Sequence, residues 1–549
     1  MSENKYVLAM YDVRGKQEFI FRTKRLQEIV GGSWIIRDIY DDYLYDAAKS
    51  AGGEIYHYKN INDDGGKDFS AESFEKHLAN GYLGEVVYEG GGNFLLLFKD
   101  RSAFQKVTYE FTRLITERIG TLRVLGTCVE IDGLSDFPKD RKELYKIHRR
   151  NEAQESNISP WSCLPIVQVD RKTSQPLVEY DLAGDDHAKE VDEGTWKEIK
   201  NSIRGKGVKG KLTKESTAKL VKFYTEKKKL ENTDYHKLSD VEKDFYQNNE
   251  SELDRLVTEK GVESQLAVVY IDGNNMGAKV QSRTEGKTTY EDCVKTLRSF
   301  SEETQKIYVE EGVRNALGDL RGEKNKHIYR IVVSAGDEIN FIVNAHDAFR
   351  CASNYLNYLS NVKGASACAG IAVFNSHAPY ADAYRIAEEA CESGKQKMKV
   401  ARMDCASFID FHICQGAIGT SLEEIREEEN GDTISRPWML WKKTEPEKKD
   451  EQITDYENDV RTVLAFLKVF ARTNVKGLLA AAKEGIVPLQ MELNRMYGHA
   501  SIENQKKYKT DWKDLQEKLQ SGNHEKIRGI IYDLALCYDL WFAGEEGKQ

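Results

Sequence analysis

Three acidic residues have the types and spacing of a site for divalent metal ions. Asp272 follows the apolar run of residues 266–271, while Asp337 and Glu338 lie in a short Ala-Gly-Asp-Glu sequence between two other apolar runs. Such runs favour buried strands, and the short break between the last two predicts a β-hairpin. Two adjacent carboxylates at a hairpin tip repel each other unless cations lie between them. With an acid at the end of a neighbouring strand, they indicate a site for Mg²⁺ or Mn²⁺, which take oxygen ligands.

Residues next to these acids are of the types that contact phosphates. Gly273 and Asn274 follow Asp272, and small residues after a strand let backbone amides approach a phosphate, although they are also common in ordinary turns. Gly336 can adopt the left-handed backbone that the tight turn requires. Two metal ions here could bridge a nucleotide triphosphate and lower the pKa of an attacking sugar hydroxyl.

Two lysines could complete such a site. Lys395 and Lys399 lie four residues apart in a predicted helix over residues 381–400, so they share one face. That face could hold a triphosphate, but a solvated amphipathic helix explains the same spacing equally well. An Asp-Glu turn alone is likewise common in hairpins, and it is the addition of Asp272 that favours a metal site.

The elements that must position these residues occur twice in the same order. In the second copy they are a strand over 266–271, a helix over 289–317, hairpin strands over 327–333 and 339–343, a helix over 346–359, a strand over 366–374, a helix over 381–400 and a strand over 407–413. In the first copy they are a strand over 5–11 that ends in Asp12, a helix over 23–49, hairpin strands over 85–88 and 94–98, a helix over 102–119 and a strand over 122–131. This βαββαβ order predicts a ferredoxin-like fold, and its repetition indicates an internal duplication.

The chain as a whole is predicted to be an α+β protein of four parts. Residues 1–150 and 263–420 form the two ferredoxin-like domains, and the polar residues 151–262 connect them. The connector includes a Gly- and Lys-rich loop over 205–211, which we interpret as solvated. Residues 421–549 show helical periodicity and no strand pattern, which predicts a C-terminal helical domain.

Composition narrows the class of protein. The 549 residues carry a net charge of −10, which argues against a general nucleic-acid binder. The N-terminus has no signal-peptide pattern, and the apolar runs are too short to cross a bilayer. Nine scattered cysteines without a Cys-x-x-Cys pair favour reduced thiols and a cytoplasmic location, and they give no zinc-site signal.

The second copy resembles the palm domain of GGDEF nucleotide cyclases and of the large, polymerase-cyclase subunit of type III CRISPR effector complexes. Ala-Gly-Asp-Glu-Ile over 335–339 is similar to the family hairpin, and Asp-Gly-Asn-Asn-Met-Gly over 272–277 is similar to the strand end of the CRISPR subunit. Ala-Glu-Glu-Ala over 387–390, followed by Gly-Lys, resembles a helix of the cyclases. The first copy resembles that subunit's first palm through Lys-Gln-Glu-Phe-Ile-Phe over 16–21 and Gly-Gly-Gly-Asn-Phe over 90–94.

This resemblance implies roles for individual residues. Asp272, Asp337 and Glu338 would be the catalytic acids and would bind two Mg²⁺ or Mn²⁺ ions. The residues that would contact the nucleotide are Gly273, Asn274, Gly336, Lys395 and Lys399, with Gly91 and Gly92 in the first palm. The first palm has Gly92 and Asn93 where the second has its acids, so we interpret it as the half that holds an acceptor nucleotide.

The resemblance also implies a function and partners. It predicts a nucleotidyltransferase that makes a cyclic or linear oligonucleotide, with ATP as the expected substrate, in prokaryotic antiviral defence. Guide or target RNA and small helical CRISPR subunits, bound through the C-terminal domain, would be partners. A dedicated cyclic-dinucleotide synthase and a catalytically weak scaffold subunit are the alternatives, and Asn274 in place of a family acid favours the scaffold. The chain is expected to be a reduced form that lacks the family's nuclease domain and zinc element.

Overall fold

The computed structural model describes most of the chain, and its contacts divide that chain into two compact units. The described residues are 5–23, 25–59, 69–90, 93–154, 167–170, 173–179, 211–231, 256, 264–320, 329–403, 405–414, 420–429, 431–443 and 454–542. The first unit holds residues 1–251, 276–306 and 335–337, and the second holds 252–275, 307–334 and 338–549. The predicted division into four domains stays a prediction.

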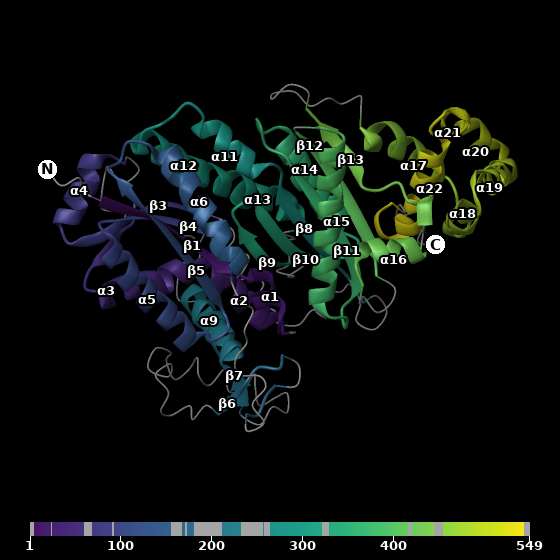
Figure 1. Cartoon of the computed structure of the whole chain (residues 1–549). Helices are drawn as coiled ribbons and strands as arrows, with labels where there is room; N and C mark the ends of the chain where they lie inside the picture. Colours follow the sequence, from purple (N-terminus) through teal and green to yellow (C-terminus); the bar gives the residue numbers. More distant parts are fainter. Residues whose placement is uncertain are drawn as a thin grey trace. The chain divides into compact units, whose positions relative to one another are not determined.

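The first unit is built on a five-stranded sheet with the strand order β2-β3-β4-β1-β5 (Figure 1). Its strands are β1 (Lys5–Arg14), β2 (Glu54–Tyr56), β3 (Tyr82–Gly90), β4 (Asn93–Phe98) and β5 (Arg123–Asp132). Its helices include α1 (Lys16–Phe21), α2 (Leu26–Ile39), η1 (Tyr40–Leu44), α3 (Tyr45–Ser50), α4 (Ala71–Ala79), α5 (Arg101–Arg118) and α6 (Phe137–Gln154). The order β3-β4-β1-β5 is that of a ferredoxin-like sheet, as the sequence predicts, and β2 is an additional edge strand.

Both faces of this sheet are covered, which explains why β1 is apolar along almost its whole length. Leu8 and Met10 pack on one face with residues of α4, α6 and α12 (Tyr290–Thr304). On the other face, the ring of Tyr11 lies 5.6 Å from that of Phe111 in α5. Helix α12 therefore completes the core of the first unit, although in the sequence it comes after the first strand of the second unit's sheet.

The connector between the two sheets contributes a docked helix. Helix α9 (Lys214–Glu231) packs on α2, and the Nζ of its buried Lys219 lies 2.7 Å from Glu215 Oε1 and donates a hydrogen bond to the carbonyl of Phe19. Gly31 makes this approach possible, because a Cβ there would lie 2.0 Å from the Lys219 carbonyl oxygen. The Gly- and Lys-rich loop over 205–210 lies outside the described residues.

Replacing Gly31 with alanine is expected to push α9 away from α2. A Cβ in a packed contact forces backbone shifts that cost about 1–3 kcal/mol. Hydrogen exchange of the α9 peptides should rise in Gly31→Ala, and the melting temperature should fall. Gly277→Ala is the control, because a Cβ at Gly277 meets no atom within 4 Å. Unchanged exchange in Gly31→Ala would contradict the docking described here.

The second unit is built on a six-stranded sheet with the strand order β13-β12-β11-β8-β10-β9. Its strands are β8 (Gln265–Gly273), β9 (Tyr329–Ala335), β10 (Glu338–Asn344), β11 (Ala367–Asn375), β12 (Ala406–Ile413) and β13 (Trp438–Lys442). The order β11-β8-β10-β9 again is ferredoxin-like, so the predicted α+β fold with two such sheets is confirmed. Strand β13 was not expected, since residues 421–549 show no strand pattern.

Two helices of the second unit pack closely on its sheet. Helix α15 (Tyr380–Val400) lies against β8, β11 and β12, and a Cβ at Gly370 of β11 would lie 1.9 Å from the Ala387 carbonyl oxygen. Helix α14 (Ala348–Ser360) also packs on the sheet, and its Leu356 carbonyl accepts a 2.8 Å hydrogen bond from Trp441 in β13. The predicted helix over 289–317 is confirmed as α12, η4 (Gln305–Glu311) and α13 (Gly312–Leu317).

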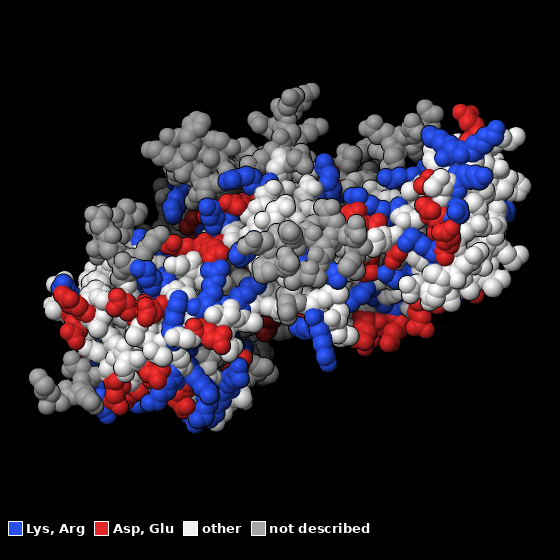
Figure 2. Space-filling view, turned by 90° about the horizontal axis from the view of Figure 1, so that it is seen from above, with Lys and Arg blue, Asp and Glu red and all other residues white. Residues whose placement is uncertain are grey.

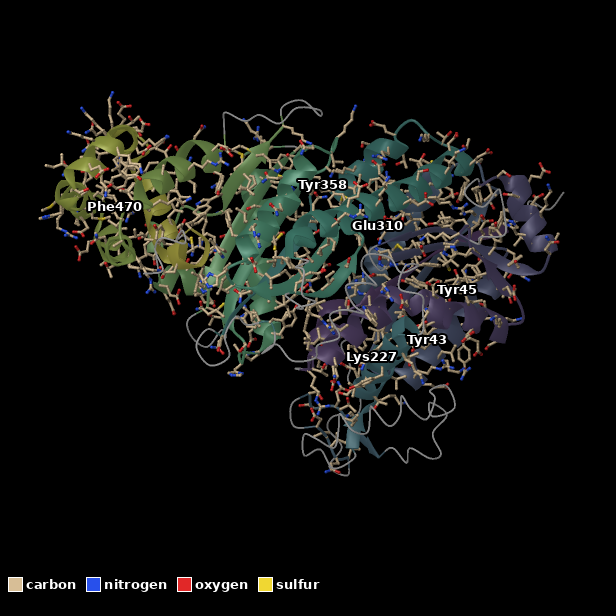
Figure 3. All side chains as sticks on the ribbon, turned by 180° about the vertical axis from the view of Figure 1, so that it is seen from behind. Tyr43, Tyr45, Lys227, Glu310, Tyr358 and Phe470 are labelled. Carbon is tan, nitrogen blue, oxygen red and sulfur yellow. The ribbon has the colours of Figure 1, made fainter. Side chains whose placement is uncertain are left out.

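The C-terminal residues form a helical bundle that packs on the sheet of the second unit. The helices are α16 (Leu422–Glu429), η7 (Tyr456–Val460), α17 (Arg461–Leu467), α18 (Arg472–Glu484), α19 (Ile486–His499), α20 (Ile502–Lys507), α21 (Lys509–Gln520) and α22 (His524–Trp541). Phe470, labelled in Figure 3, contacts Phe466 within this bundle. The Trp541 ring of α22 lies 5.2 Å from Phe349 of α14 and 4.9 Å from Phe411 of β12.

Two features of the surface bear on partners. Figure 2 shows basic and acidic side chains interspersed over the face drawn, as expected for a chain with nearly equal numbers of both. Among the helices that the structure describes, none has the length and apolar character needed to span a bilayer.

Candidate active site

Two of the predicted acids lie opposite each other on neighbouring strands. Strands β8 and β10 are antiparallel, and their register pairs Asp272 with Glu338. Directly opposite residues of an antiparallel pair project from the same face of the sheet. The two carboxylates therefore share one face at the end of β8, as the sequence analysis expects.

Lys395 of α15 reaches this end of β8. Its Nζ lies 2.5 Å from Asp272 Oδ2 and 3.2 Å from the carbonyl oxygen of Gly273. Burial alone would lower the pKa of Lys395, but the Asp272 carboxylate raises it more, so the pKa lies above the ordinary value. The ammonium is therefore charged at neutral pH and bridges a carboxylate and a backbone carbonyl.

A layer of buried tyrosines lies next to Glu338 on the same face of the sheet. The Tyr384 hydroxyl of α15 donates a 3.2 Å hydrogen bond to Glu338 Oε1, and the Tyr384 ring packs edge-on against Tyr270 of β8. Tyr380, one turn earlier, donates to the side chain of Asn340. Burial and the nearby Glu338 carboxylate raise the pKa of all three tyrosines, so they stay protonated, and Tyr380 and Tyr384 act as hydrogen-bond donors.

The turn of the hairpin has the predicted geometry. Gly336 has a φ of 66°, the left-handed conformation expected for it. Asp337 is half-buried and lies between Gly336 and Glu338, at the end of the hairpin. By its contacts Asp337 is counted with the first unit, whereas Asp272 and Glu338 belong to the second. Its part in a shared site therefore stays a prediction.

Asn274 and Lys399 lie in surroundings that differ from the expected ones. Asn274 is only 1% exposed, and its amide donates to the Ala406 carbonyl at 2.8 Å and to Ser366 Oγ at 3.3 Å. Lys399 is exposed, and its ammonium lies 3.4 Å from Glu392 rather than beside Lys395. The shared face predicted for the two lysines thus does not bring both to Asp272. The predicted residues Gly91 and Gly92 lie outside the described residues.

The acids do not form a preassembled metal cluster. In the parts of the chain that the structure describes, no three His, Cys, Asp or Glu side chains are grouped so that they could hold a metal ion. The chemistry of the donors nevertheless fits a hard cation, because Asp272 and the Gly273 carbonyl already bind one, the ammonium of Lys395.

Comparison with known families decides the kind of domain. Residues 265–402 match a family model described as Cas10/Cmr2, second palm domain. This segment is a Cas10/Cmr2 second palm domain. It extends from β8 to the end of α15 and so includes Asp272, Asp337, Glu338 and Lys395. The resemblance to the CRISPR polymerase-cyclase subunit is thereby confirmed for this segment.

Solved structures similar to this chain, which carries the Cas10/Cmr2 palm, are Csm1-Csm4 cassettes. One in complex with one ATP is 10% identical, with a TM-score of 0.49 over 98% of this chain and 70% of that chain. One with pppApApA is 12% identical, with a TM-score of 0.48 over 97% of this chain and 69% of that chain. One with AMPPNP is 12% identical at a TM-score of 0.42, and this chain spans only 54% of its length. No curated protein matches the sequence.

The first ferredoxin-like sheet has an acid where the Cas10/Cmr2 palm has Asp272. Asp12 pairs with Asn93 across β1 and β4, as Asp272 pairs with Glu338 across β8 and β10. Asp12 is buried, and its Oδ2 lies 2.9 Å from the Arg14 guanidinium. The duplication has thus kept the acid at the strand end, paired it with an arginine and replaced the opposite acid with an amide.

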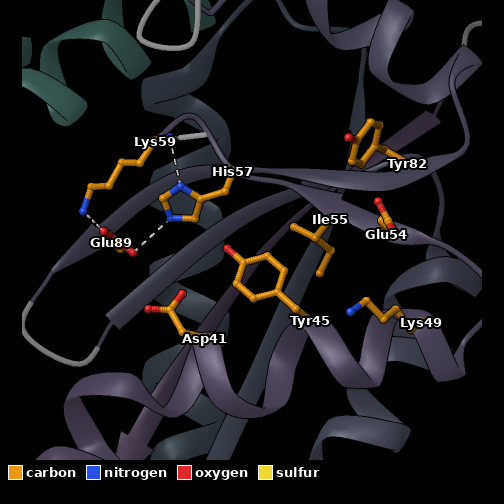
Figure 4. A pocket seen from close by; sticks show the side chains of 9 residues that line it. All are labelled: Asp41, Tyr45, Lys49, Glu54, Ile55, His57, Lys59, Tyr82 and Glu89. Carbon is orange, nitrogen blue, oxygen red and sulfur yellow. Dashed lines mark hydrogen bonds and ion pairs between the residues drawn. The ribbon is translucent and has the colours of Figure 1, made fainter. Parts of the chain in front are cut away.

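A pocket of about 510 Å³ lies in the first unit, between α3 and the strands β2 and β3 (Figure 4). At one end, His57 Nε2 lies 3.2 Å from Glu89 and the Lys59 ammonium pairs with the same carboxylate. Burial alone would raise the pKa of Glu89, but His57 and Lys59 together have the larger, opposite effect and lower this pKa to about 2. The pocket mixes carboxylates with lysines that already form ion pairs with acidic side chains. Such a lining does not suit a triphosphate. Among the predicted nucleotide-binding residues that the structure describes, none lines this pocket.

Sequence reasoning missed the tyrosines beside Glu338. Tyr380 and Tyr384 lie four residues apart at the start of α15, so their common face is visible in the sequence. Aromatic residues at helical spacing are typical of any core, however. Only the position of α15 over β8 and β10 shows that their hydroxyls meet polar side chains.

Replacing Tyr384 with phenylalanine is expected to reduce the nucleotidyltransferase activity that the family resemblance implies by less than about tenfold. The change removes one hydrogen bond to Glu338, a net contribution of about 0.5–1.5 kcal/mol. The rate of nucleotide consumption at saturating substrate measures the effect. A loss as large as that of an Asp272 variant would mean that the hydroxyl takes part in the reaction directly.

Proposed function

We propose that this chain is a metal-dependent nucleotidyltransferase that joins ATP into a cyclic or linear oligonucleotide and releases pyrophosphate. The observation that carries the proposal is the end of β8, where Asp272 and Glu338 share one face and a lysine from α15 binds Asp272 and the Gly273 carbonyl. Carboxylates, a carbonyl and a cation at one point suit phosphoryl transfer, which needs positioning and charge stabilisation. The Cas10/Cmr2 palm in the same segment supports this reaction class.

The residues have distinct parts in this proposal. Asp272, Asp337 and Glu338, with the Gly273 carbonyl, would hold Mg²⁺ or Mn²⁺, which neutralises phosphate charge and lowers the pKa of the attacking hydroxyl. Lys395 would move its ammonium onto the phosphates. Tyr384 keeps Glu338 oriented through its hydrogen bond.

The first ferredoxin-like domain would hold the acceptor nucleotide, around Gly91 and Gly92. Its pairing of Asp12 with Asn93, in place of a second acid, supports a binding half without metal chemistry of its own. By family likeness, the biological setting would be prokaryotic antiviral defence, with RNA and small helical subunits of a type III CRISPR complex as partners.

A second candidate is a catalytically weak scaffold subunit of such a complex. The observation that favours it is Asn274, which is buried and donates to the Ala406 carbonyl, so that an acid expected from the family is missing from the strand end. A dedicated cyclic-dinucleotide synthase remains the alternative within the enzyme class.

The test is to incubate the purified protein with each nucleotide triphosphate and Mg²⁺ or Mn²⁺ and to identify products by mass spectrometry. We expect an oligoadenylate with ATP and none in Asp337→Ala, and its mass gives the product length. A product of two nucleotides would favour the dinucleotide synthase. Binding of ATP without turnover, with or without added RNA, would favour the scaffold.

A further inference from the structure

The ammonium of Lys395 occupies the place of a cation at the end of β8. It lies within hydrogen-bond distance of Asp272 Oδ2 and of the Gly273 carbonyl oxygen, at 2.5 and 3.2 Å. Both atoms are hard oxygen donors of the kind that Mg²⁺ and Mn²⁺ take. A lysine charge and a divalent ion at the same carboxylate repel each other, so the lysine lowers the affinity of Asp272 for the ion.

The lysine is held in this place by the packing of α15. Gly394 brings the helix close to the sheet, since a Cβ there would lie 3.0 Å from Phe408 Cβ and 3.4 Å from Cys368 Sγ. The Lys395 side chain is only 15% exposed and that of Asp272 28%, so the pair is partly shielded from water and salt. The contact is therefore stronger than an exposed ion pair.

Lys395 offsets one of the two carboxylate charges that face each other at this end of β8. Asp272 and Glu338 contribute two negative charges, and Lys395 contributes one positive charge. Asn274, the next polar side chain along, is neutral and directs its amide to a carbonyl and a hydroxyl. With Lys395 in this place, the two carboxylates attract a divalent ion less than they would without it, until a triphosphate adds its own negative charge.

We infer that Lys395 is an internal counter-ion that weakens metal binding at Asp272 until a nucleotide arrives. The inference rests on the proposed function. Phosphate oxygens draw the ammonium off Asp272, which frees the carboxylate and the Gly273 carbonyl for the metal. Metal and nucleotide then bind cooperatively, and each raises the affinity for the other by the same factor.

The test measures Mn²⁺ binding without nucleotide, by the loss of the electron paramagnetic resonance signal of free Mn²⁺. Lys395→Met is expected to bind Mn²⁺ at least about fivefold more tightly than the unchanged protein, the lower end of typical couplings. Lys395→Arg keeps the charge and should bind as weakly as the unchanged protein. Lys513→Met removes an exposed lysine of α21 and should have no effect.

A non-hydrolysable ATP analogue completes the test. It should tighten Mn²⁺ binding in the unchanged protein and do so much less in Lys395→Met, where the carboxylate is already free. Circular dichroism and the melting temperature check that each variant is folded, and Lys395→Arg separates the charge from packing.

Two failures can be told apart. If Asp272→Asn loses Mn²⁺ binding while Lys395→Met binds no more tightly than the unchanged protein, the counter-ion is wrong and the metal site stands. If Asp272→Asn binds Mn²⁺ as before, with or without the analogue, then Asp272 is not a metal ligand and the proposed function falls with it.

Discussion

Replacing Asp533 with alanine is expected to destabilise the second unit by about 3–5 kcal/mol. Asp533 of α22 is fully buried, and its Oδ2 accepts hydrogen bonds of 2.9 Å from the Ser435 and Arg436 amides and from the Ser435 hydroxyl. Its other oxygen pairs with the buried Arg436 guanidinium. Removing the carboxylate leaves these donors, one of them charged, without their acceptor in the interior.

The same network explains why the loss extends to the sheet. Arg436 also lies 3.6 Å from Asp410 of β12, which is buried and held at 2.7 and 2.9 Å by Arg426 of α16. These charges therefore join the C-terminal helices to the strand beside the Cas10/Cmr2 palm. Their loss should weaken both parts.

Urea unfolding, followed by hydrogen exchange of peptides from α22 and β12, measures the effect. The control is Asp539→Ala on the same helix. Asp539 pairs with Arg472 and Lys476, and all three side chains are partly exposed, so removing the Asp539 carboxylate should cost no more than about 1 kcal/mol. Equal effects of the two substitutions would contradict the structural role given to Asp533.

Replacing Asp272 with asparagine is expected to reduce the rate of nucleotide consumption at least about a hundredfold. The change keeps the size of the side chain but removes the charge that Lys395 now balances and that a metal ion would need. Losing one group that stabilises transition-state charge typically costs a factor of 10²–10³. The measurement is the initial rate of pyrophosphate release from ATP with Mn²⁺.

The Asp272 variant should stay folded, which separates activity from stability. Asp272 lies at the end of β8, a central strand, and its side chain is 28% exposed, so the substitution changes the end of this strand rather than the core of the sheet. The melting temperature should change by only a few degrees. A variant that unfolds at the assay temperature would contradict this expectation and give Asp272 a structural role.

The sequence predicts the two sheets well because their central strands are apolar on both faces. Strands such as β1 and β8 stand out as runs that contrast with the charged helices around them. Strand β13 is five residues long and follows Pro437, so it gives too short a signal. Helix α19 carries Pro488 in its first turn, where proline is tolerated.

The site is only partly visible in the sequence. The positions of Asp272 and Glu338 follow from strand ends and a turn, which are local signals. The contact of Lys395 with Asp272 depends on how α15 crosses β8, which no spacing reveals. Lys399 shares a helix face with Lys395 but lies about 6 Å further along the axis, where the helix reaches solvent.

The most direct test of the account compares the equivalent acids of the two ferredoxin-like sheets in one assay. Asp272→Asn and Asp12→Asn make the same chemical change at equivalent strand ends. With ATP and Mn²⁺, we predict that pyrophosphate release is lost in Asp272→Asn and retained in Asp12→Asn. Retention in Asp272→Asn with loss in Asp12→Asn would place the reaction in the first unit and contradict the central claim.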